Sequence, residues 1–403
     1  MNYKPLYSLS VFYEDSLVGK LALKDRRIWF QYDAAFLRKG VELSPFKLPL
    51  RPEVTPCNDR VFDGLFGLFN DSLPDGWGRL LLDRHVRNLG IPPENLTVLD
   101  RLAYVGERGI GALIYKHDHQ HDRFVYEHLN LDRLAAESQA VLAGESQAVI
   151  EELMALGGSP AGARPKILAG VNKNKTHIIH GTDNISDDYE HWIIKFGSNL
   201  DPKDNGAIEY AYSMMARAAG INIPETHLFP ATKGAGYFGI KRFDRHTNKR
   251  IHVHTVSGLL HADHRMPSMD YEGILKASLA LTKSMPDVEA FFRLAAFNIF
   301  AKNRDDHTKN FSFLMDDDGT WHVAPAYDLT FSSGPGGEHS TTIMGEGKNP
   351  GHLHLLALGR KMNIKKAGDI IEQVYAAISR WNEFSDIAGV SKESRKLIKD
   401  NIG

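Results

Sequence analysis

Two carboxylates and a carboxamide are spaced in this sequence as phosphate transfer from Mg·ATP requires. Asp305 is followed five positions later by Asn310, with His307 and Lys309 between them, and Asp328 comes eighteen positions after Asn310. In a phosphotransferase, one carboxylate orients the attacking hydroxyl, while the Asn and the second carboxylate hold the metal. The Asp-to-Asn interval equals that of the protein-kinase catalytic loop HRDxxxxN, although the order of His and Asp is reversed. The segment therefore predicts a phosphotransfer site.

Two other interpretations of the same segment remain open from its residues alone. Asp, Asp and His in succession could form a metal-hydrolase site, or the segment could be a solvated polar turn. Its flanks argue against the turn, because residues 294–300 are apolar at helical spacing and residues 311–314 look like a short buried strand. A polar cluster between two core elements costs free energy unless its groups have partners or a function. We therefore expect a functional site.

Length and composition limit the class of protein. The chain has 403 residues, 42% hydrophobic and 24% charged, which is ordinary globular composition and enough for two or three domains. Its net charge of −2 does not point to nucleic acid or an anionic membrane as the main partner. The single cysteine, Cys57, excludes an internal disulfide framework. No signal peptide or membrane-spanning run is visible, so we expect a cytoplasmic protein.

The pattern along the chain predicts an α+β protein with two lobes. Residues 6–32 have strand alternation, and helical patterns follow at about 61–70 and 77–89. A second strand-rich region contains residues 191–196, a helix over 207–219 and a strand near 239–245, and from about 270 the pattern is mainly helical. The expected domains are an N-terminal α/β module at 1–130, a helical connector at 131–156, a nucleotide-binding lobe at 157–245 and a helical catalytic lobe at 246–403.

A Gly-rich segment at 156–166 is a candidate phosphate-binding loop. Its glycines would let backbone N–H groups approach phosphates, and Arg164 and Lys166 add charge. The segment is not a Walker A loop, since Ala163-Arg164 stands where Lys-Ser/Thr is required. A helix-ending turn is the alternative.

A lysine and a glutamate further along could assist that loop. Lys195 lies on an apolar strand pattern and matches the phosphate-gripping lysine of kinases; Glu209, on the next helix, could pair with it. An edge lysine and a solvated glutamate are the alternatives. For Asp328, which follows the apolar run 323–327, the alternative to a metal ligand is a helix N-cap.

Two groups of histidines invite a metal interpretation that we consider weaker. His117, His119 and His121 alternate along one stretch, which we interpret as a polar hairpin end. His252, His254, His261 and His264 have loose spacing and no HExxH frame, so we expect structural roles.

With these residues in place, the chain resembles the HipA-type serine/threonine-kinase toxins of bacterial toxin–antitoxin systems. The resemblance covers most of the chain, and its most specific motif is Asn303-x-Asp305-Asp306-His307-x-Lys309-Asn310-Phe311-Ser312. Supporting motifs are 325–329 (PAYDL), 158–166 (GSPAGARPK), 241–245 (KRFDR) and 73–79 (LPDGWGR).

The resemblance implies an atypical protein-kinase-like fold and Mg·ATP-dependent phosphorylation of serine or threonine. It implies that Asp305 is catalytic, that Asn310 and Asp328 bind magnesium, and that Ser159 is autophosphorylated, which would silence the enzyme. The residues implied to contact ATP are Ser159, Ala161, Gly162, Ala163, Arg164, Lys166, Lys195, Lys241, Arg242, Phe243, His307, Lys309, Asn310 and Tyr327.

The resemblance also implies partners that the residues themselves do not specify. These are a helix-turn-helix antitoxin of the HipB type, operator DNA reached only through that antitoxin, and a separate small protein like the HipA N-terminal domain in some architectures. The implied substrate is a translation-related protein such as an aminoacyl-tRNA synthetase. A small-molecule kinase and a non-catalytic kinase-like scaffold for an antitoxin–DNA complex remain alternatives.

Overall fold

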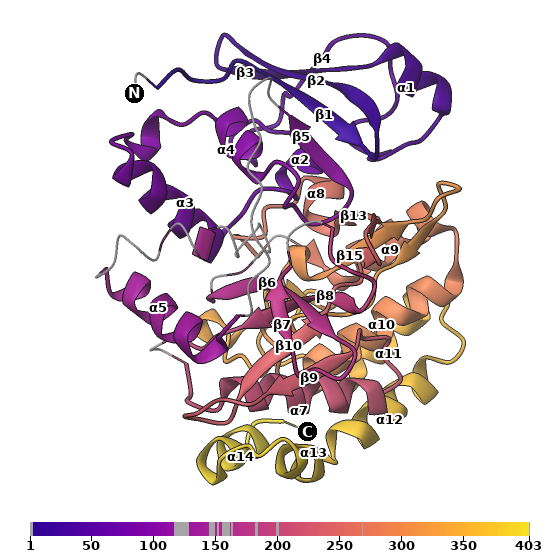
Figure 1. Ribbon diagram of the computed structural model, residues 1–403. Helices are drawn as coiled ribbons and strands as arrows, with labels where there is room; N and C mark the ends of the chain where they lie inside the picture. Colours follow the sequence, from indigo (N-terminus) through magenta and orange to yellow (C-terminus); the bar gives the residue numbers. More distant parts are fainter. Residues whose placement is uncertain are drawn as a thin grey trace. The chain divides into compact units, whose positions relative to one another are not determined.

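The structure is a computed structural model that describes residues 3–116, 129–144, 150, 153–154, 162, 164–181, 184–198, 201–267 and 269–402. Three predicted site residues, Ser159, Ala161 and Ala163, lie outside the described residues, as do the histidines at 117, 119 and 121. The chain divides into two compact units, whose helices and strands are labelled in Figure 1. Unit 1 comprises Met1–Leu200, Lys241–His254 and Gly258–His261, and unit 2 comprises Asp201–Ile240, Thr255–Ser257 and Ala262–Gly403.

Unit 1 begins with an antiparallel sheet that matches the strand pattern expected at 6–32. Its strands β1 (Ser8–Tyr13), β2 (Ser16–Lys24), β3 (Arg27–Tyr32), β4 (Thr55–Pro56) and β5 (Leu113–Lys116) have the order β4-β3-β2-β1-β5. Alternate residues such as Leu9, Val11 and Phe30 are buried, because strand side chains point to opposite faces in turn. The helices of this part are α1 (Ala34–Lys39), α2 (Gly67–Asn70), α3 (Gly76–Asn88), η1 (Pro93–Asn95) and α4 (Val98–Val105).

The expected helix at 61–70 is wrong over its first half. Only α2 is helical there, and residues 61–64 form a turn in which Asp63 and Gly64 have φ values of 54° and 82°. A right-handed helix cannot contain such residues. The apolar spacing that suggested a longer helix comes from Phe62, Leu65 and Phe66. Their side chains are buried, although the residues are not helical.

A second antiparallel ladder in unit 1 carries several predicted site residues. Strand β6 (Lys166–Asn172) pairs with both β7 (Ile178–His180) and β8 (Tyr189–Lys195). All but the last residue of β6 is buried, which explains its nearly continuous apolar sequence. Unit 1 also contains α5 (Leu131–Ala143), which ends at Gly144, and the hairpin of β11 (Arg245–His246) and β12 (Lys249–Arg250).

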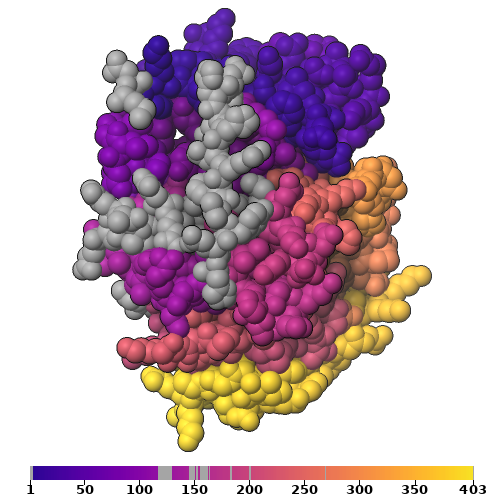
Figure 2. Space-filling model, viewed as in Figure 1, coloured from indigo at the N-terminus to yellow at the C-terminus, as the bar shows by residue number. Residues whose placement is uncertain are grey.

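Unit 2 is mainly helical, and its part from residue 270 onward matches the helical pattern of the sequence. Its helices are α7 (Asn205–Ala218), α9 (Tyr271–Thr282), α10 (Met285–Phe300), η2 (Thr308–Asn310), η3 (Pro335–Gly337), α11 (His352–Lys361), α12 (Ala367–Ile378), α13 (Trp381–Ile387) and α14 (Lys392–Lys399). The last two helices, yellow in Figure 2, form part of the surface of unit 2 on the face shown. Helix α10 is the central element, since ten of its residues are buried around its circumference.

Unit 2 also contains short strands. They are the hairpin β9 (Thr226–Phe229) and β10 (Tyr237–Lys241), the hairpin β15 (Ser312–Met315) and β16 (Trp321–Val323), and the parallel pair β14 (Met269–Asp270) and β17 (Thr341–Thr342). Strand β13 (His252–Thr255) and helix α8 (Val256–Leu260) lie where the chain passes from one unit to the other. Within the described ranges, no helix is both long enough and apolar enough to cross a membrane.

Candidate active site

The end of α10 places the Asp305 segment. Ser284 caps the start of this helix, its hydroxyl accepting from the N–H of Asp287 at 3.3 Å. The helix ends where Lys302 takes φ 51°, which turns the backbone out of the helical path. Asn303 is tied back to the helix, because its N–H donates to the carbonyl of Asn298 at 2.9 Å and its side-chain amide donates to the Asn298 side chain at 3.0 Å.

Asp305 and Asn310 lie at the two ends of one compact loop. The side-chain amide of Asn310 donates to the backbone carbonyl of Asp305 at 2.7 Å. The Asp305 side chain is 64% exposed, and its Oδ1 lies 3.9 Å from Nε2 of His307. Helix η2 closes the loop, with the N–H of Asn310 donating to the His307 carbonyl at 2.9 Å. The predicted catalytic carboxylate is therefore held at its backbone while its oxygens face solvent.

Tyr327 links this loop to the segment that carries Asp328. Its hydroxyl donates to the backbone carbonyl of Lys309 at 2.6 Å and is also hydrogen-bonded to the hydroxyl of Ser312. The next residue, Asp328, has φ 56°, a left-handed conformation that costs a non-glycine residue about 1–3 kcal/mol. No helix begins at residues 324–334, so the helix N-cap alternative for Asp328 is wrong.

Asp306 is a residue of this loop to which the sequence assigned no role. Its side chain is fully buried, and it accepts hydrogen bonds from Tyr271 and from three residues of the 339–341 segment. The doubled aspartate at 305–306 was the available signal, but the sequence does not tell which of two neighbouring carboxylates faces inward.

In unit 1, the structure brings Gly162, Lys166 and Lys195 together. Lys166 and Lys195 are directly opposite each other in the β6–β8 register, so both side chains lie on the same face of the ladder. Gly162 has φ 114°, and a Cβ at this position would collide with the Lys166 ammonium group. Arg164 lies half-buried just before β6. Two lysines and a glycine backbone thus meet at one end of the ladder.

The turn before α3 supports Gly162. The Gly162 N–H donates to the Asp75 carboxylate, and the Gly162 carbonyl accepts from the N–H of Trp77 at 3.2 Å. Asp75 and Trp77 belong to the LPDGWGR motif, whose sequence did not indicate this contact. The Asp75 carboxylate can reach a backbone donor because it stands at the N-cap position of α3 without capping it through a side-chain hydrogen bond.

The KRFDR motif at 241–245 contributes three ion pairs in unit 1. Lys241 is paired with Glu190 at 2.6 Å. Asp244 is buried and paired with Arg242 at 2.7 Å and Arg245 at 2.8 Å. Burial raises the pKa of Asp244, but the two guanidinium groups outweigh it and hold that pKa well below its usual range. The Arg242 side chain therefore has its ion-pair partner within the protein. Phe243, which lies between Arg242 and Asp244 in the sequence, is half-buried.

Histidines around this motif and strand β13 have protein partners. Burial, with the charges of Arg242 and Arg245, lowers the pKa of His191 to about 4.

The histidines of strand β13 are hydrogen-bonded within unit 1. His254 is hydrogen-bonded to the Asp71 carboxylate at 2.6 Å and to the Ser44 hydroxyl at 3.0 Å, and His252 to the Leu43 carbonyl at 2.9 Å. Ser44, His254 and Asp71 have the order of a hydrolase triad, yet Ser44 is 1% exposed and out of a substrate's reach. Among the described residues, no group of three or more His, Cys, Asp and Glu side chains could hold a metal ion.

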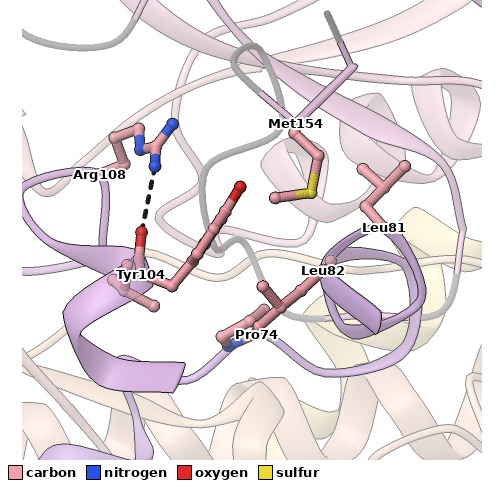
Figure 3. A pocket seen from close by; sticks show the side chains of 8 residues that line it. Pro74, Leu81, Leu82, Tyr104, Arg108 and Met154 are labelled. Atoms are coloured by element: carbon pink, nitrogen blue, oxygen red, sulfur yellow. Dashed lines mark hydrogen bonds between the residues drawn. The ribbon is translucent and has the colours of Figure 1, made fainter. Parts of the chain in front are cut away.

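One pocket of unit 1 lies between α3 and α4 and has an empty volume of about 320 Å³ (Figure 3). Arg108 at its edge donates to the Tyr104 carbonyl at 3.1 Å. It is lined by Pro74, Gly78, Leu81, Leu82, Tyr104, Val105, Arg108 and Met154. None of these is a predicted site residue, so the pocket is not the candidate active site.

The fold alone defines the structural class of this protein. It is an α+β protein, and its structure is similar to a chain in the Shewanella oneidensis MR-1 complex of the toxin–antitoxin proteins HipA and HipB with operator DNA. The TM-score is 0.69 at 16% identity, over 97% of this chain and 94% of that chain. The expected atypical kinase-like α+β fold is thereby confirmed.

Family models match both parts of the sequence. Residues 9–116 match the HipA N-terminal domain, and residues 158–381 match the HipA-like C-terminal domain. The chain belongs to the HipA family, as its motifs predicted.

Two further proteins show weaker or more partial similarity. The protein of Sinorhizobium fredii (strain NBRC 101917 / NGR234) named "Putative kinase Y4dM" is 30% identical over 153 residues, 34% of this chain and 36% of its own length. The match thus spans about a third of that curated relative. A Helicobacter pylori proinflammatory kinase, CtkA, has 14% identity and a TM-score of 0.35 over 54% of this chain and 89% of that chain, which is too low to argue from.

Proposed function

We propose that this chain is a Mg·ATP-dependent kinase that phosphorylates serine or threonine hydroxyls of a protein. The observation that carries the proposal is the Asp305–Asn310 loop of a HipA-family chain. In it an exposed carboxylate is held at its backbone by the Asn310 side chain. A group that accepts a proton from a hydroxyl must reach substrate while its backbone stays fixed. Asp305 meets both conditions.

Asn310 and Asp328 are suited to magnesium by their donor chemistry. Mg²⁺ prefers hard oxygen ligands and commonly takes only one or two carboxylates from the protein, with phosphates and water completing its shell. A carboxamide and a carboxylate therefore suffice, and a cluster of three acidic or histidine ligands is not required. When bound, the metal would neutralise charge on the phosphates. The left-handed backbone of Asp328 is a cost that the proposed role explains.

Lys166 and Lys195 are the proposed contacts for the nucleotide phosphates. The two lysines are directly opposite each other in the ladder, so their side chains lie on one face, and the Lys166 ammonium lies beside the Gly162 backbone. Two cationic side chains on one face suit an anionic group such as a phosphate. The motifs imply further ATP contacts, by Arg164 and Lys241 in unit 1 and by His307 and Tyr327 in unit 2.

We further propose that the kinase is the toxin of a toxin–antitoxin pair with a HipB-type antitoxin. The similar Shewanella oneidensis chain comes from a complex of HipA, HipB and operator DNA, and this supports the proposal for the present chain. A translation-related protein such as an aminoacyl-tRNA synthetase is the proposed substrate. Autophosphorylation of Ser159 would silence the enzyme, because a phosphate there would repel ATP.

The test is phosphate transfer from γ-labelled ATP with Mg²⁺, to the chain itself and to extracts of translation proteins. Wild type is expected to transfer label, and Asp305→Gln is expected to bind ATP by calorimetry but transfer none. Ser159→Ala should remove self-labelling while retaining transfer to other proteins. Undiminished transfer by Asp305→Gln would refute the assignment of Asp305. Transfer to metabolites but to no protein would instead indicate a small-molecule kinase.

A further inference from the structure

The carboxylate of Asp306 accepts four hydrogen bonds within unit 2, and its side chain has no solvent exposure. Oδ2 accepts from the Tyr271 hydroxyl at 2.6 Å and from Nδ1 of His339 at 2.9 Å. Oδ1 accepts from the backbone N–H groups of Ser340 at 2.9 Å and Thr341 at 3.2 Å. A buried carboxylate costs several kcal/mol in desolvation unless such donors surround it. The donors are therefore what keeps this side chain inside.

The donors come from two segments far from Asp306 in sequence. Tyr271 begins α9 and itself accepts from the Asn298 side chain of α10 at 3.1 Å. The other three belong to the segment that leads into β17 and follows Asp328 along the chain. Asp306 thus joins helix α9 and the segment at 339–341 to a single point of the catalytic loop.

The same segment also grips the residue before Asp305. The backbone N–H and the hydroxyl of Ser340 both donate to the Arg304 carbonyl at 3.1 Å. The hydroxyl of Thr341 donates to the Asp306 carbonyl. The peptide units before Asp305 and after Asp306 are therefore held by contacts with residues 340–341, the segment whose backbone also donates to the Asp306 carboxylate.

We propose that Asp306 is a positioning residue for the phosphate transfer proposed above. The two neighbouring carboxylates have opposite surroundings: Asp305 is 64% exposed by its side chain, whereas Asp306 has 0% exposure. Locking the Asp306 side chain inward sets the direction of the preceding residue, because backbone torsion angles couple adjacent side chains. Asp306 cannot itself touch substrate. It acts by holding Asp305 in one orientation.

The proposal predicts a loss in catalytic rate rather than in nucleotide affinity. Asp306→Asn retains shape but replaces one oxygen by a donor, so that two of the four donors lose their acceptor. We expect kcat to fall about 10–100-fold, because misplacement of a reacting group lowers the rate by a factor of this size. KM for ATP and the ATP dissociation constant should change by less than about threefold, and the protein should remain folded at the assay temperature.

Unit 1 offers a matched control. Asp71 and His254 form a second buried carboxylate–imidazole pair, at 2.6 Å, in a unit that lacks Asp305. Asp71→Asn should lower the melting temperature to a similar degree but leave kcat of the folded protein unchanged. Within unit 2, His339→Asn retains a side-chain N–H donor near the position of Nδ1 and should retain kcat to within about threefold. His339→Leu lacks the donor and should lose kcat as Asp306→Asn does.

Hydrogen–deuterium exchange tests the anchoring without reference to activity. In Asp306→Asn, exchange should accelerate at 303–310 and 339–341, while protection of β1–β3 stays unchanged. Full wild-type protection in these segments, or kcat within twofold of wild type in folded Asp306→Asn protein, would overturn the positioning role. If wild type transfers no phosphate, the proposed function fails, and the exchange result still decides whether Asp306 holds the loop.

Discussion

The two regions that carry the predicted site are prepared in different ways. In unit 2 the Asp305–Asn310 loop is held by many neutral and charged hydrogen bonds, and one carboxylate is left facing solvent. In unit 1 the end of the β6–β8 ladder sets Lys166 opposite Lys195, with positive charge gathered and a glycine backbone beside it. The hydrogen bonds in unit 2 fix the geometry of the Asp305–Asn310 loop. The two lysines in unit 1 place positive charge on one face of the ladder, where an anion could bind. For the proposed kinase, we therefore expect substitutions at Asp305 and Asp306 to lower the rate of transfer, and substitutions of Lys166 or Lys195 to weaken nucleotide binding.

Asp305→Asn should give the largest effect and should affect activity alone. Loss of a proton-accepting carboxylate is expected to reduce transfer by roughly 10²–10⁴-fold. Because the side chain is mostly exposed, the free energy of unfolding should change by less than about 0.5 kcal/mol. Labelled-ATP assays and urea denaturation measure the two quantities. Asp369→Asn, an exposed carboxylate of unit 2, is the control and should change neither.

Asp244→Asn should do the opposite and destabilise unit 1. Removing the negative charge leaves Arg242 and Arg245 buried without their counter-ion, which typically costs about 3–5 kcal/mol. Urea denaturation followed by Trp fluorescence would measure the loss, with the exposed turn residue Asp25 as the matched Asp→Asn control. A loss below 1 kcal/mol would mean that the two arginines find other partners.

Unit 1 should also lose stability in mild acid because of two buried histidines. Burial first, and nearby positive charges second, lower the pKa of both His191 and His252 to about 4. The unfolded chain takes up these protons near pH 6.5, whereas the folded protein resists them down to about pH 4. Stability is thus complete above pH 6.5 and falls between pH 6.5 and 4, by at most about 3 kcal/mol for each group. His191→Gln should flatten the measured pH dependence, and an unchanged slope would contradict the assignment.

Lys166→Met should give the smallest effect, and this effect should be on binding. Loss of one charged contact should weaken ATP binding about tenfold. The buried stem of Lys166 is replaced by an apolar side chain, so the free energy of unfolding of the ATP-free protein should change by less than about 1 kcal/mol. Calorimetry and denaturation separate the two, and Lys24→Met, an exposed strand-end lysine, is the control. Unchanged ATP affinity would argue that Lys166 is structural.

Local patterns in the sequence were sufficient for much of the fold. Strand alternation identified β1–β3, the apolar run at 294–300 lies in α10, and Gly220 ends the helix expected at 207–219. These features depend on neighbouring residues, so a one-dimensional pattern contains them. The helix expected at 61–70 is wrong over its first half, because the apolar residues there are buried without being helical. The positive φ values at Asp63 and Gly64 are not visible in an apolar pattern.

The sequence by itself determined the family and the chemical types of the candidate site. Asp305, Asn310 and Asp328 are recognisable from residue type and spacing, and the motifs around them are specific. Only the tertiary structure decided that Asp306 faces inward against His339–Thr341, that Lys166 stands opposite Lys195, and that Asp75 holds Gly162. These contacts join segments up to 87 residues apart. Strand register and loop packing create them, and neither property is encoded in the spacing of neighbouring residues.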